Sequence, residues 1–264
     1  MKTFDEILKS APAKHILVAP APHGSVSPAA VGGGHSLTLL PGGGAAVKEA
    51  CRMVREKEAD ILMQGDMPLG EFFALLAEAG VKRDALSFVT VLENKKQNKL
   101  LLLTDTYIHN FPTLEQKIKI LERAIAFARL LGIETPKVAA LSAIETVNAA
   151  IVSTVDAAVL SKMSQRRQFQ AMVEGPLDID AVLAREAAVK KGIESTVCGD
   201  ADIILCPDIE TATVLSQAFT FIGAYPAAGV LLGAFPLVIN PRLIPPDFKE
   251  VELALAALRA GDFQ

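Results

Sequence analysis

The sequence predicts an α/β protein with mainly parallel sheets. Short apolar runs typical of buried strands alternate with segments of helical periodicity along most of the 264 residues. Such alternation indicates parallel strands joined by crossover helices. Because 51% of the residues are apolar and 21% are charged, the chain can bury a substantial core, and its length suffices for two lobes.

The individual elements follow from these periodicities in chain order. Residues 1–9 predict an amphipathic helix, and residues 20–34, rich in Pro, Gly, Ser and Ala, predict a loop. Thr113 and Gln116 predict a capping box at the start of a long helix. Strands are expected at 15–19, 37–40, 59–63, 86–92, 99–104, 137–141, 169–173, 203–206, 230–234 and 237–240. Further helices are expected at 45–54, 69–79, 113–131, 154–165, 179–190, 208–221 and 248–258.

The composition narrows the classes of partner and site. The formal net charge is −4 and no basic run occurs, so neither nucleic acid nor a membrane surface is an expected partner. The apolar runs are too short to span a bilayer, and the N-terminal stretch lacks the apolar core of a signal peptide. Three cysteines without ligand spacing predict reduced thiols, and four histidines without an H-x-x-x-H pair predict no metal site. We therefore expect a cytoplasmic protein.

Polar residues gather where predicted parallel strands end. In open α/β sheets ligands bind beyond the carboxyl ends of the strands, so these residues are candidates for substrate contact. The candidates are Thr104, Asp105, His109, Asn110, Glu174, Gly175, Pro176, Asp208 and Glu210.

Each of these groups also fits a purely structural role. Asp208 and Glu210 suit the N-terminus of the helix that follows them. Gly175 and Pro176 suit a tight turn from strand to helix, and the polar loop at 104–110 suits an exposed turn. His109 alone is weak support for a catalytic base.

One short motif occurs twice. Ala59-Asp-Ile-Leu62 is similar to Ala201-Asp-Ile-Ile-Leu205, and each leads through a proline-containing turn into a helix. The repeat predicts two equivalent lips of a cleft. A common way of beginning a buried strand explains it equally well.

Between Leu100 and Gly233 a series of motifs resembles a known family, the phosphate acetyl/butyryltransferases, and in particular their phosphotransbutyrylase branch. The resemblance covers about half the chain. The motifs include Leu-Leu-Leu-Thr-Asp-Thr106, Leu-Glu-Gln-Lys117, Thr-Val-Asp-Ala-Ala158, Glu-Gly-Pro-Leu177, Lys-Gly-Ile193, Gly-Asp-Ala-Asp-Ile203 and Pro-Asp-Ile-Glu210.

This resemblance implies two α/β/α lobes of the isocitrate/isopropylmalate dehydrogenase-like type around a cleft. One lobe is expected from residues 1–74 with 229–264, and the other, which keeps the family pattern, from residues 75–228. The resemblance also implies reversible acyl transfer between coenzyme A and phosphate, by direct attack on the thioester. Coenzyme A is then a substrate, no metal or other cofactor is needed, and a homodimer is expected.

The chain departs from the family pattern near its C-terminus. Arg242 matches the family's arginine and is the expected catalytic residue, because a guanidinium can hold phosphate bidentately. Pro241 replaces the family's serine, and Ile244 stands where an acid or hydroxyl is usual. Asn240 is a candidate for substrate binding, and a solvated surface position is the alternative for Arg242.

A second departure follows the predicted strand at 59–63. The family commonly has Lys-Gly and a Ser-Thr pair there, whereas this chain has Gln64, Gly65 and Asp66. Gln64 and Gly65 remain candidates for substrate binding, but the carboxylate of Asp66 repels a phosphate dianion. The losses concentrate on the side of the cleft expected to hold phosphate.

Three hypotheses about function therefore stay open. The first is a phosphate acyltransferase, with Arg242 stabilising charge. The second is a catalytically impaired relative that binds coenzyme A or an acyl phosphate as a regulatory protein. The third is an acyltransferase with a different acceptor, because Asp66 and Pro241 disfavour phosphate and suit an uncharged nucleophile.

Overall fold

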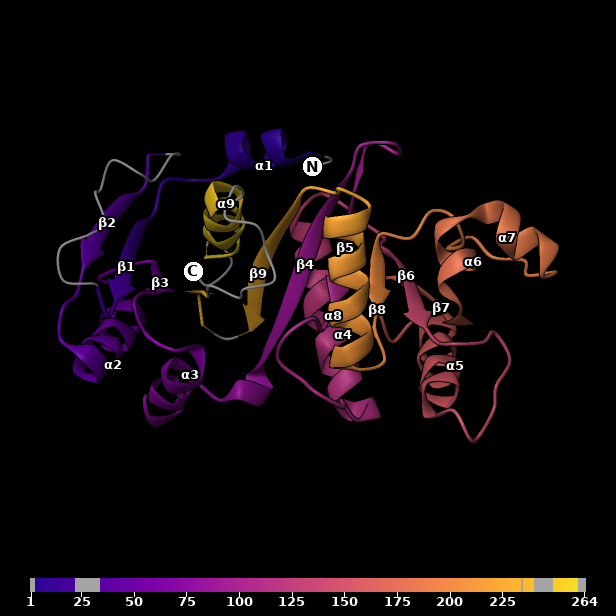
Figure 1. Cartoon of the computed structure of the whole chain (residues 1–264), viewed down its shortest axis with the longest axis horizontal. Helices are drawn as coiled ribbons and strands as arrows, with labels where there is room; N and C mark the ends of the chain where they lie inside the picture. Colours follow the sequence, from indigo (N-terminus) through magenta and orange to yellow (C-terminus); the bar gives the residue numbers. More distant parts are fainter. Residues whose placement is uncertain (1–2, 22–33, 234, 240–248, 261–264) are drawn as a thin grey trace. The chain divides into compact units, whose positions relative to one another are not determined.

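The computed structural model describes residues 3–21, 34–233, 235–239 and 249–260 (Figure 1). The chain divides into two compact units. Ser87–Pro226 form one, called the central unit, and Thr3–Leu86 with Ala227–Gln264 form the other, called the terminal unit. The lobe limits expected from the sequence, after residues 74 and 228, stay a prediction of domain organisation.

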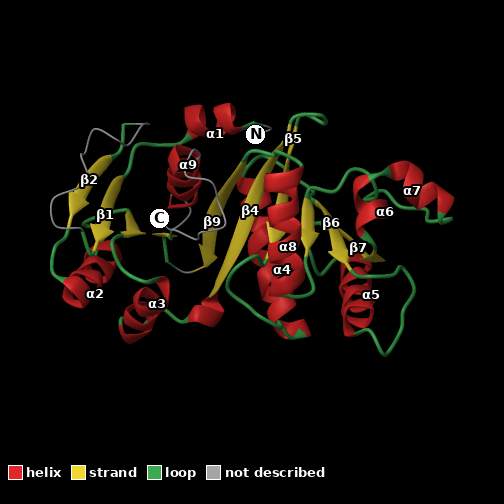
Figure 2. Cartoon of the chain, viewed as in Figure 1, coloured by secondary structure: helices red, strands yellow, loops and turns green. Residues whose placement is uncertain are grey.

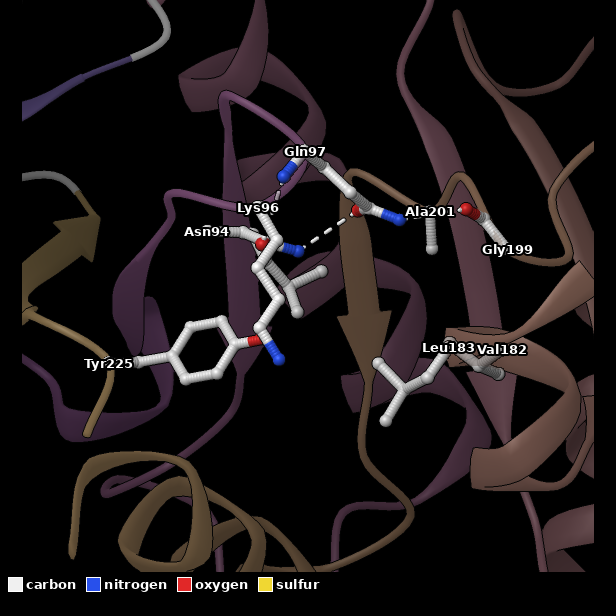
Figure 3. A pocket seen from close by; sticks show the side chains of 9 residues that line it. Asn94, Lys96, Gln97, Val182, Leu183, Gly199, Ala201 and Tyr225 are labelled. Atoms are coloured by element: carbon white, nitrogen blue, oxygen red, sulfur yellow. Dashed lines mark hydrogen bonds between the residues drawn. The ribbon is translucent and has the colours of Figure 1, made fainter. Parts of the chain in front are cut away.

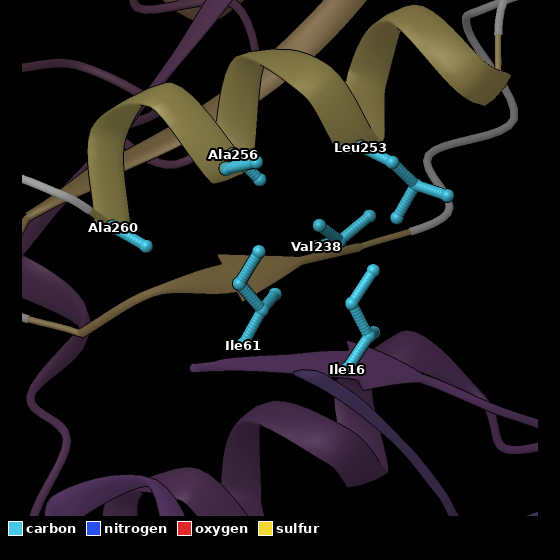
Figure 4. Packing of buried hydrophobic residues seen from close by; sticks show 7 residues of the cluster. Ile16, Ile61, Val238, Leu253, Ala256 and Ala260 are labelled. Carbon is cyan, nitrogen blue, oxygen red and sulfur yellow. The ribbon is translucent and has the colours of Figure 1, made fainter. Parts of the chain in front are cut away.

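The terminal unit has a parallel sheet in which the strand order is β10-β3-β1-β2. Ile16 and Ile61 of this sheet pack with Val238 against Leu253 and Ala256 of the C-terminal helix, as Figure 4 shows. The elements are α1 (Phe4–Ser10), β1 (His15–Ala19), β2 (Ser36–Leu39), α2 (Gly43–Arg55), β3 (Ile61–Gln64), α3 (Leu69–Glu78), η2 (Arg83–Ala85), β9 (Ala227–Gly233), β10 (Leu237–Val238) and α9 (Lys249–Ala260).

The central unit has a sheet with the order β7-β6-β8-β5-β4, in which β4 and β5 are antiparallel and the other neighbours are parallel (Figure 2). Leu100 to Leu103 are all buried, which means that both faces of β5 are covered. The elements are β4 (Leu86–Asn94), β5 (Lys99–Thr104), α4 (Leu114–Leu130), β6 (Lys137–Leu141), α5 (Val152–Gln165), β7 (Met172–Leu177), α6 (Ile179–Leu183), α7 (Arg185–Lys190), β8 (Ile203–Leu205), α8 (Ile209–Gln217) and η3 (Ala218–Ile222).

These observations confirm the predicted α/β class with mainly parallel sheets. The Thr113 side chain accepts a hydrogen bond from the backbone of Gln116, whose side chain bonds back, so the predicted capping box is confirmed. The cysteines at 51, 198 and 206 are free and buried. Among the described helices, none is both long and apolar enough to cross a membrane.

Several predicted elements differ from the structure at their ends, and two differ by more than that. The strand expected at 169–173 is β7, which begins at Met172 and ends at Leu177, so that Glu174, Gly175 and Pro176 lie within it. β7 is an edge strand, with β6 as its neighbour in the sheet. An edge strand tolerates the missing N–H of a proline. The single helix expected at 179–190 is two helices, because Ala184 has extended backbone angles between α6 and α7.

The repeated Ala-Asp-Ile sequence has one structural role in both units. Asp60 accepts a hydrogen bond from the first backbone N–H of β1 at 2.8 Å and pairs with Lys14 at 3.1 Å. Asp202 accepts from the first backbone N–H of β6 at 2.9 Å and pairs with Lys99 at 2.7 Å. Both aspartates therefore tie together the amino ends of neighbouring strands. This geometry favours the strand-beginning explanation of the repeat over two lips of a cleft.

Glu252 of α9 predicts a measurable pH dependence of stability. Its side chain is buried, with Oε1 accepting from the backbone N–H of Gly229 and Oε2 paired with Lys249 at 3.0 Å. Burial raises the pKa of this carboxyl, and the neighbouring Lys249 ammonium only partly offsets the rise. The folded protein then holds this proton more tightly than the unfolded chain. Its contribution to the free energy of unfolding is present at acid pH and is lost as the pH rises through the folded pKa.

Glu252→Gln should therefore flatten the fall in stability as the pH rises above the ordinary pKa of a glutamate, about 4. Urea unfolding at a series of pH values would measure this slope for both proteins. The exposed Glu250 of the same helix supplies the control, and Glu250→Gln should leave the slope as it is. Equal slopes for the parent protein and Glu252→Gln would contradict a raised pKa at Glu252.

Candidate active site

The candidate site lies at the carboxyl ends of β5 and β8 in the central unit. The two strands are parallel neighbours, with Leu102 opposite Ile203 and Thr104 opposite Leu205. The chain continues from β5 into α4 and from β8 into α8, and both helices contact β5. In Figure 1, α8 lies in front of the sheet and α4 behind it. The chain thus leaves two adjacent strands toward opposite faces, which in open α/β sheets marks the place of ligand binding.

Asp105 organises the loop that follows β5. The residue is 3% exposed. Its Oδ1 accepts hydrogen bonds from the backbone N–H groups of Phe88 (3.2 Å), Tyr107 (2.9 Å) and Ile108 (2.9 Å). Its Oδ2 lies 2.7 Å from Nδ1 of His109. These bonds leave the carboxylate little freedom to turn, and they give Asp105 a structural role whatever else it does.

The same loop is joined to the end of β8. The backbone N–H of Cys206 donates to the carbonyl of Thr104 at 2.7 Å, and that of Ile209 donates to the carbonyl of Asn110 at 2.9 Å. The structure therefore brings Thr104, Asp105, His109 and Asn110 together, beside the start of α8. The Thr104 hydroxyl is itself buried and donates to the carbonyl of Phe88 at 3.3 Å.

Asp208 caps α8. Its Oδ1 accepts a hydrogen bond from the backbone N–H of Thr211 at 2.7 Å, and Glu210 is exposed in the first turn. A carboxylate at this position stabilises the positive end of the helix dipole. The capping alternative considered for Asp208 is thus what the geometry shows, and contact with a substrate stays a prediction.

A buried ion pair beside the site was missed by the predictions. Nζ of Lys117, in the first turn of α4, lies 2.8 Å from Oδ2 of Asp156 on α5, and the two side chains are 7% and 13% exposed. The pair lines a recess of about 10 Å³ with Cys206, which is room for no more than one water. The available signal was the spacing: Lys117 falls on the same helix face as the buried Ile120 and Leu121.

Glu174 and Gly175 have packing and hydrogen-bonding roles inside β7. A Cβ on Gly175 would lie 2.7 Å from the carbonyl oxygen of Ala140 and 3.1 Å from Cβ of Ala157, so only glycine fits between β6 and α5. Oε1 of Glu174 accepts from the backbone N–H and the hydroxyl of Thr196, at 3.3 and 3.0 Å. Glu174 also lines a cavity of about 390 Å³. Pro176 is buried in the strand.

A further cavity of about 170 Å³, shown in Figure 3, lies beside the same sheet at the opposite ends of its strands. Leu101 near the start of β5 and Ala201 before β8 contribute to its wall, together with Lys96 and Tyr225. It therefore lies at the amino ends of the parallel strands and is separate from the candidate site.

One group of acidic side chains has metal-like spacing. The carboxylates of Glu145, Asp178 and Asp180 lie close together. Nζ of Lys191 pairs with each of them, so the cluster already has a cation of its own. These residues give no support for a metal site.

In the terminal unit, Gln64 and Gly65 lie at the carboxyl end of β3. Nε2 of Gln64 donates to the carbonyl of Met67 at 2.8 Å. A Cβ on Gly65 would lie 1.9 Å from the carbonyl oxygen of Pro20. Asn240 and Arg242 lie outside the described residues, so their expected roles stay predictions.

Comparison with known proteins identifies the family. The family model for phosphate acetyl/butaryl transferase matches residues 45–236. Phosphate butyryltransferase of Clostridium acetobutylicum is 39% identical over 222 residues, which are 82% of this chain and 74% of the relative. Phosphate acetyltransferase of Thermotoga maritima is 38% identical over 216 residues, which are 80% of this chain and 74% of the relative.

Solved structures agree with this result. The crystal structure of a branched-chain phosphotransacylase from Enterococcus faecalis superposes with a TM-score of 0.79 at 27% identity, covering 97% of this chain and 93% of that one. A phosphotransacetylase from Streptococcus pyogenes, at 17% identity and a TM-score of 0.69, shares the fold. The match to residues 45–236 and the identity to curated relatives together show that the chain belongs to the phosphate acetyl/butyryltransferase family.

Proposed function

We propose that this protein transfers an acyl group between coenzyme A and phosphate by direct attack of phosphate on the thioester. The observation that carries the proposal is the match of residues 45–236 to a family whose named relatives are phosphate acetyl- and butyryltransferases. The substrates proposed for this protein are taken from the names of these relatives. The polar loop after β5, placed where open α/β sheets bind ligands, supports it.

Direct transfer requires phosphate to be positioned against the thioester carbonyl and the developing negative charge to be stabilised. We assign the second task to Arg242, which matches the family's arginine. The segment that carries Asn240 and Arg242 follows β10, Gln64 is the last residue of β3, and Gly65 follows it. Because β10 and β3 are parallel neighbours, both segments begin at the same edge of that sheet, which supports a shared phosphate site.

Arg242→Ala tests this assignment. Loss of a group that stabilises transition-state charge should lower phosphate-dependent release of thiol from acetyl- or butyryl-CoA by about 10²- to 10³-fold. Arg242→Lys keeps the positive charge but loses the bidentate geometry of the guanidinium. Its rate of thiol release should lie between those of the parent protein and Arg242→Ala. A thiol-release assay with and without phosphate measures all three, and full activity of Arg242→Ala would remove Arg242 from the mechanism.

The same assay separates the alternatives. Coenzyme A binding by calorimetry without any thiol release would favour a regulatory binding protein. Release that ignores phosphate and responds to another nucleophile would favour a changed acceptor, as Asp66 and Pro241 suggest.

We further propose a cytoplasmic homodimer that needs no cofactor, with coenzyme A as a substrate. The family resemblance is the main support. Val152, Val155 and Val159 add to it, because they expose 66%, 37% and 37% of their surface on α5. Analytical ultracentrifugation would test the assembly, and a monomer at micromolar concentration would contradict it.

A further inference from the structure

We propose that His109, oriented by Asp105, carries the proton that this acyl transfer moves between phosphate and the sulfur of coenzyme A. The inference rests on the proposed function. When hydrogen phosphate attacks the thioester, a carbon–oxygen bond forms, the carbon–sulfur bond breaks, and the phosphate O–H proton must end on the departing sulfur. One nitrogen lone pair that accepts this proton and then donates it completes the balance without any co-reactant. The reverse reaction moves the proton back by the same route.

The orientation of His109 is set by its neighbours. Nδ1 lies 2.7 Å from Oδ2 of Asp105, and the backbone bonds to the other carboxylate oxygen hold Asp105 in place. The carboxyl group of Asp105 acts as an acceptor toward three backbone N–H groups, and as an acceptor toward the ring as well it places the hydrogen on Nδ1 and leaves Nε2 with its lone pair. An imidazole with this tautomer is suited to general base catalysis at neutral pH.

Nε2 of His109 is the atom that needs a partner. The residue is 7% exposed, and this nitrogen has no hydrogen-bond partner among the described residues. Leaving a buried polar atom without a partner destabilises a folded protein. His15 shows the opposite arrangement: its Nδ1 lies 3.1 Å from the carbonyl of Glu58, and its Nε2 lies 2.8 Å from the Thr38 hydroxyl. A histidine that serves packing alone has both nitrogens satisfied, whereas His109 keeps one unused at the carboxyl end of β5.

The other charged groups around the pair leave His109 as the proton carrier. Arg123 of α4 acts on Asp105 electrostatically, and Asp208 lies beyond β8 as the cap of α8. Cys206 follows β8, where burial raises the pKa of its thiol, with the carboxylates of Asp208 and Asp105 adding to the rise. The thiol therefore stays protonated and does not compete as a base or nucleophile.

His109→Gln is the first test, because glutamine keeps a donor toward Asp105 but cannot relay a proton. We expect kcat/KM to fall by about 10²- to 10⁴-fold and the limb of its pH profile that reports this proton transfer to disappear, while KM for coenzyme A and the melting temperature change little. His15→Gln is the matched control, in which the pH profile should keep its shape. An unchanged rate and pH profile in His109→Gln would overturn the proposal.

The parent protein supplies a second test that needs no substitution. Nitrogen-15 NMR of the histidine rings should show His109 protonated at Nδ1, with the Nε2 signal shifting when coenzyme A and phosphate are added together. Protonation at Nε2 instead would overturn the proposal. Failure of the parent protein to release thiol with phosphate would refute the proposed function itself, which is a different result from activity that survives His109→Gln.

Discussion

Lys117→Met should lower the free energy of unfolding by about 3–5 kcal/mol, because it leaves the carboxylate of Asp156 buried without its cation. The two groups lie 2.8 Å apart with side chains 7% and 13% exposed, so water cannot replace the lost partner at low cost. Asp156→Ala should have a similar effect by leaving the ammonium unpaired. Urea denaturation of each variant measures the loss.

The double variant Lys117→Met/Asp156→Leu should recover most of this loss, because two apolar side chains of similar size remove both desolvated charges. Lys119 and Glu115 give the control: they pair at 2.7 Å on the same helix, but their side chains are 54% and 79% exposed. Lys119→Met should change stability far less than Lys117→Met does, because solvent already screens this pair. Equal effects of the substitutions at 117 and 119 would show that burial does not set the strength of the pair.

Gly65→Ala should destabilise the protein by about 3 kcal/mol, at the upper end of overpacking effects. Its new Cβ would lie 1.9 Å from the carbonyl oxygen of Pro20, and the Gly65 and Asp66 N–H groups bond to the carbonyls of Ala19 and Pro20. A backbone oxygen held in this way cannot rotate aside as a side chain would. The segments after β1 and β3 must therefore separate, which thermal unfolding would detect.

Gly70→Ala is the matched control. Gly70 is exposed within α3, and a Cβ there would meet nothing within 4 Å. Alanine at a helical position without contacts should stabilise by about 0.5–1 kcal/mol. If Gly65→Ala keeps its stability and loses only activity, the glycine serves a ligand and not the packing against Pro20.

The accuracy of the predicted elements depends on where each segment's partners are. β1, β5 and β6 have the bounds that their apolar runs predict. A buried strand is apolar along its length, so the limits of the apolar run are also the limits of the strand. The predicted bounds of β7 were too early in the sequence, because Gly175 and Pro176 are typical turn residues and were assigned to a turn. Their place in an edge strand depends on β6 and α5, which are distant in sequence.

In the candidate site, too, features set by neighbouring residues were predictable and features set by distant segments were not. The polar loop after β5 and the capping residue Asp208 are recognisable because a strand end and a helix start are local patterns. The pairing of Lys117 with Asp156 joins residues 39 positions apart, and no local pattern indicates that these two would meet. The bond from Asp105 to His109 is short-range, yet its burial depends on the neighbouring strands.

The order of residues is thus enough for the α/β class, the alternation of strands and helices, and the family, because periodicity and motifs are properties of neighbouring residues. The sequence does not show which polar groups have hydrogen-bond partners within the protein and which are available to a substrate. Folding assigned Asp208 to a helix cap, Glu174 to Thr196 and Gly175 to close packing, and it left Nε2 of His109 without a partner among the described residues. Hydrogen bonding and burial are settled only when distant segments come together, so these roles require the tertiary structure.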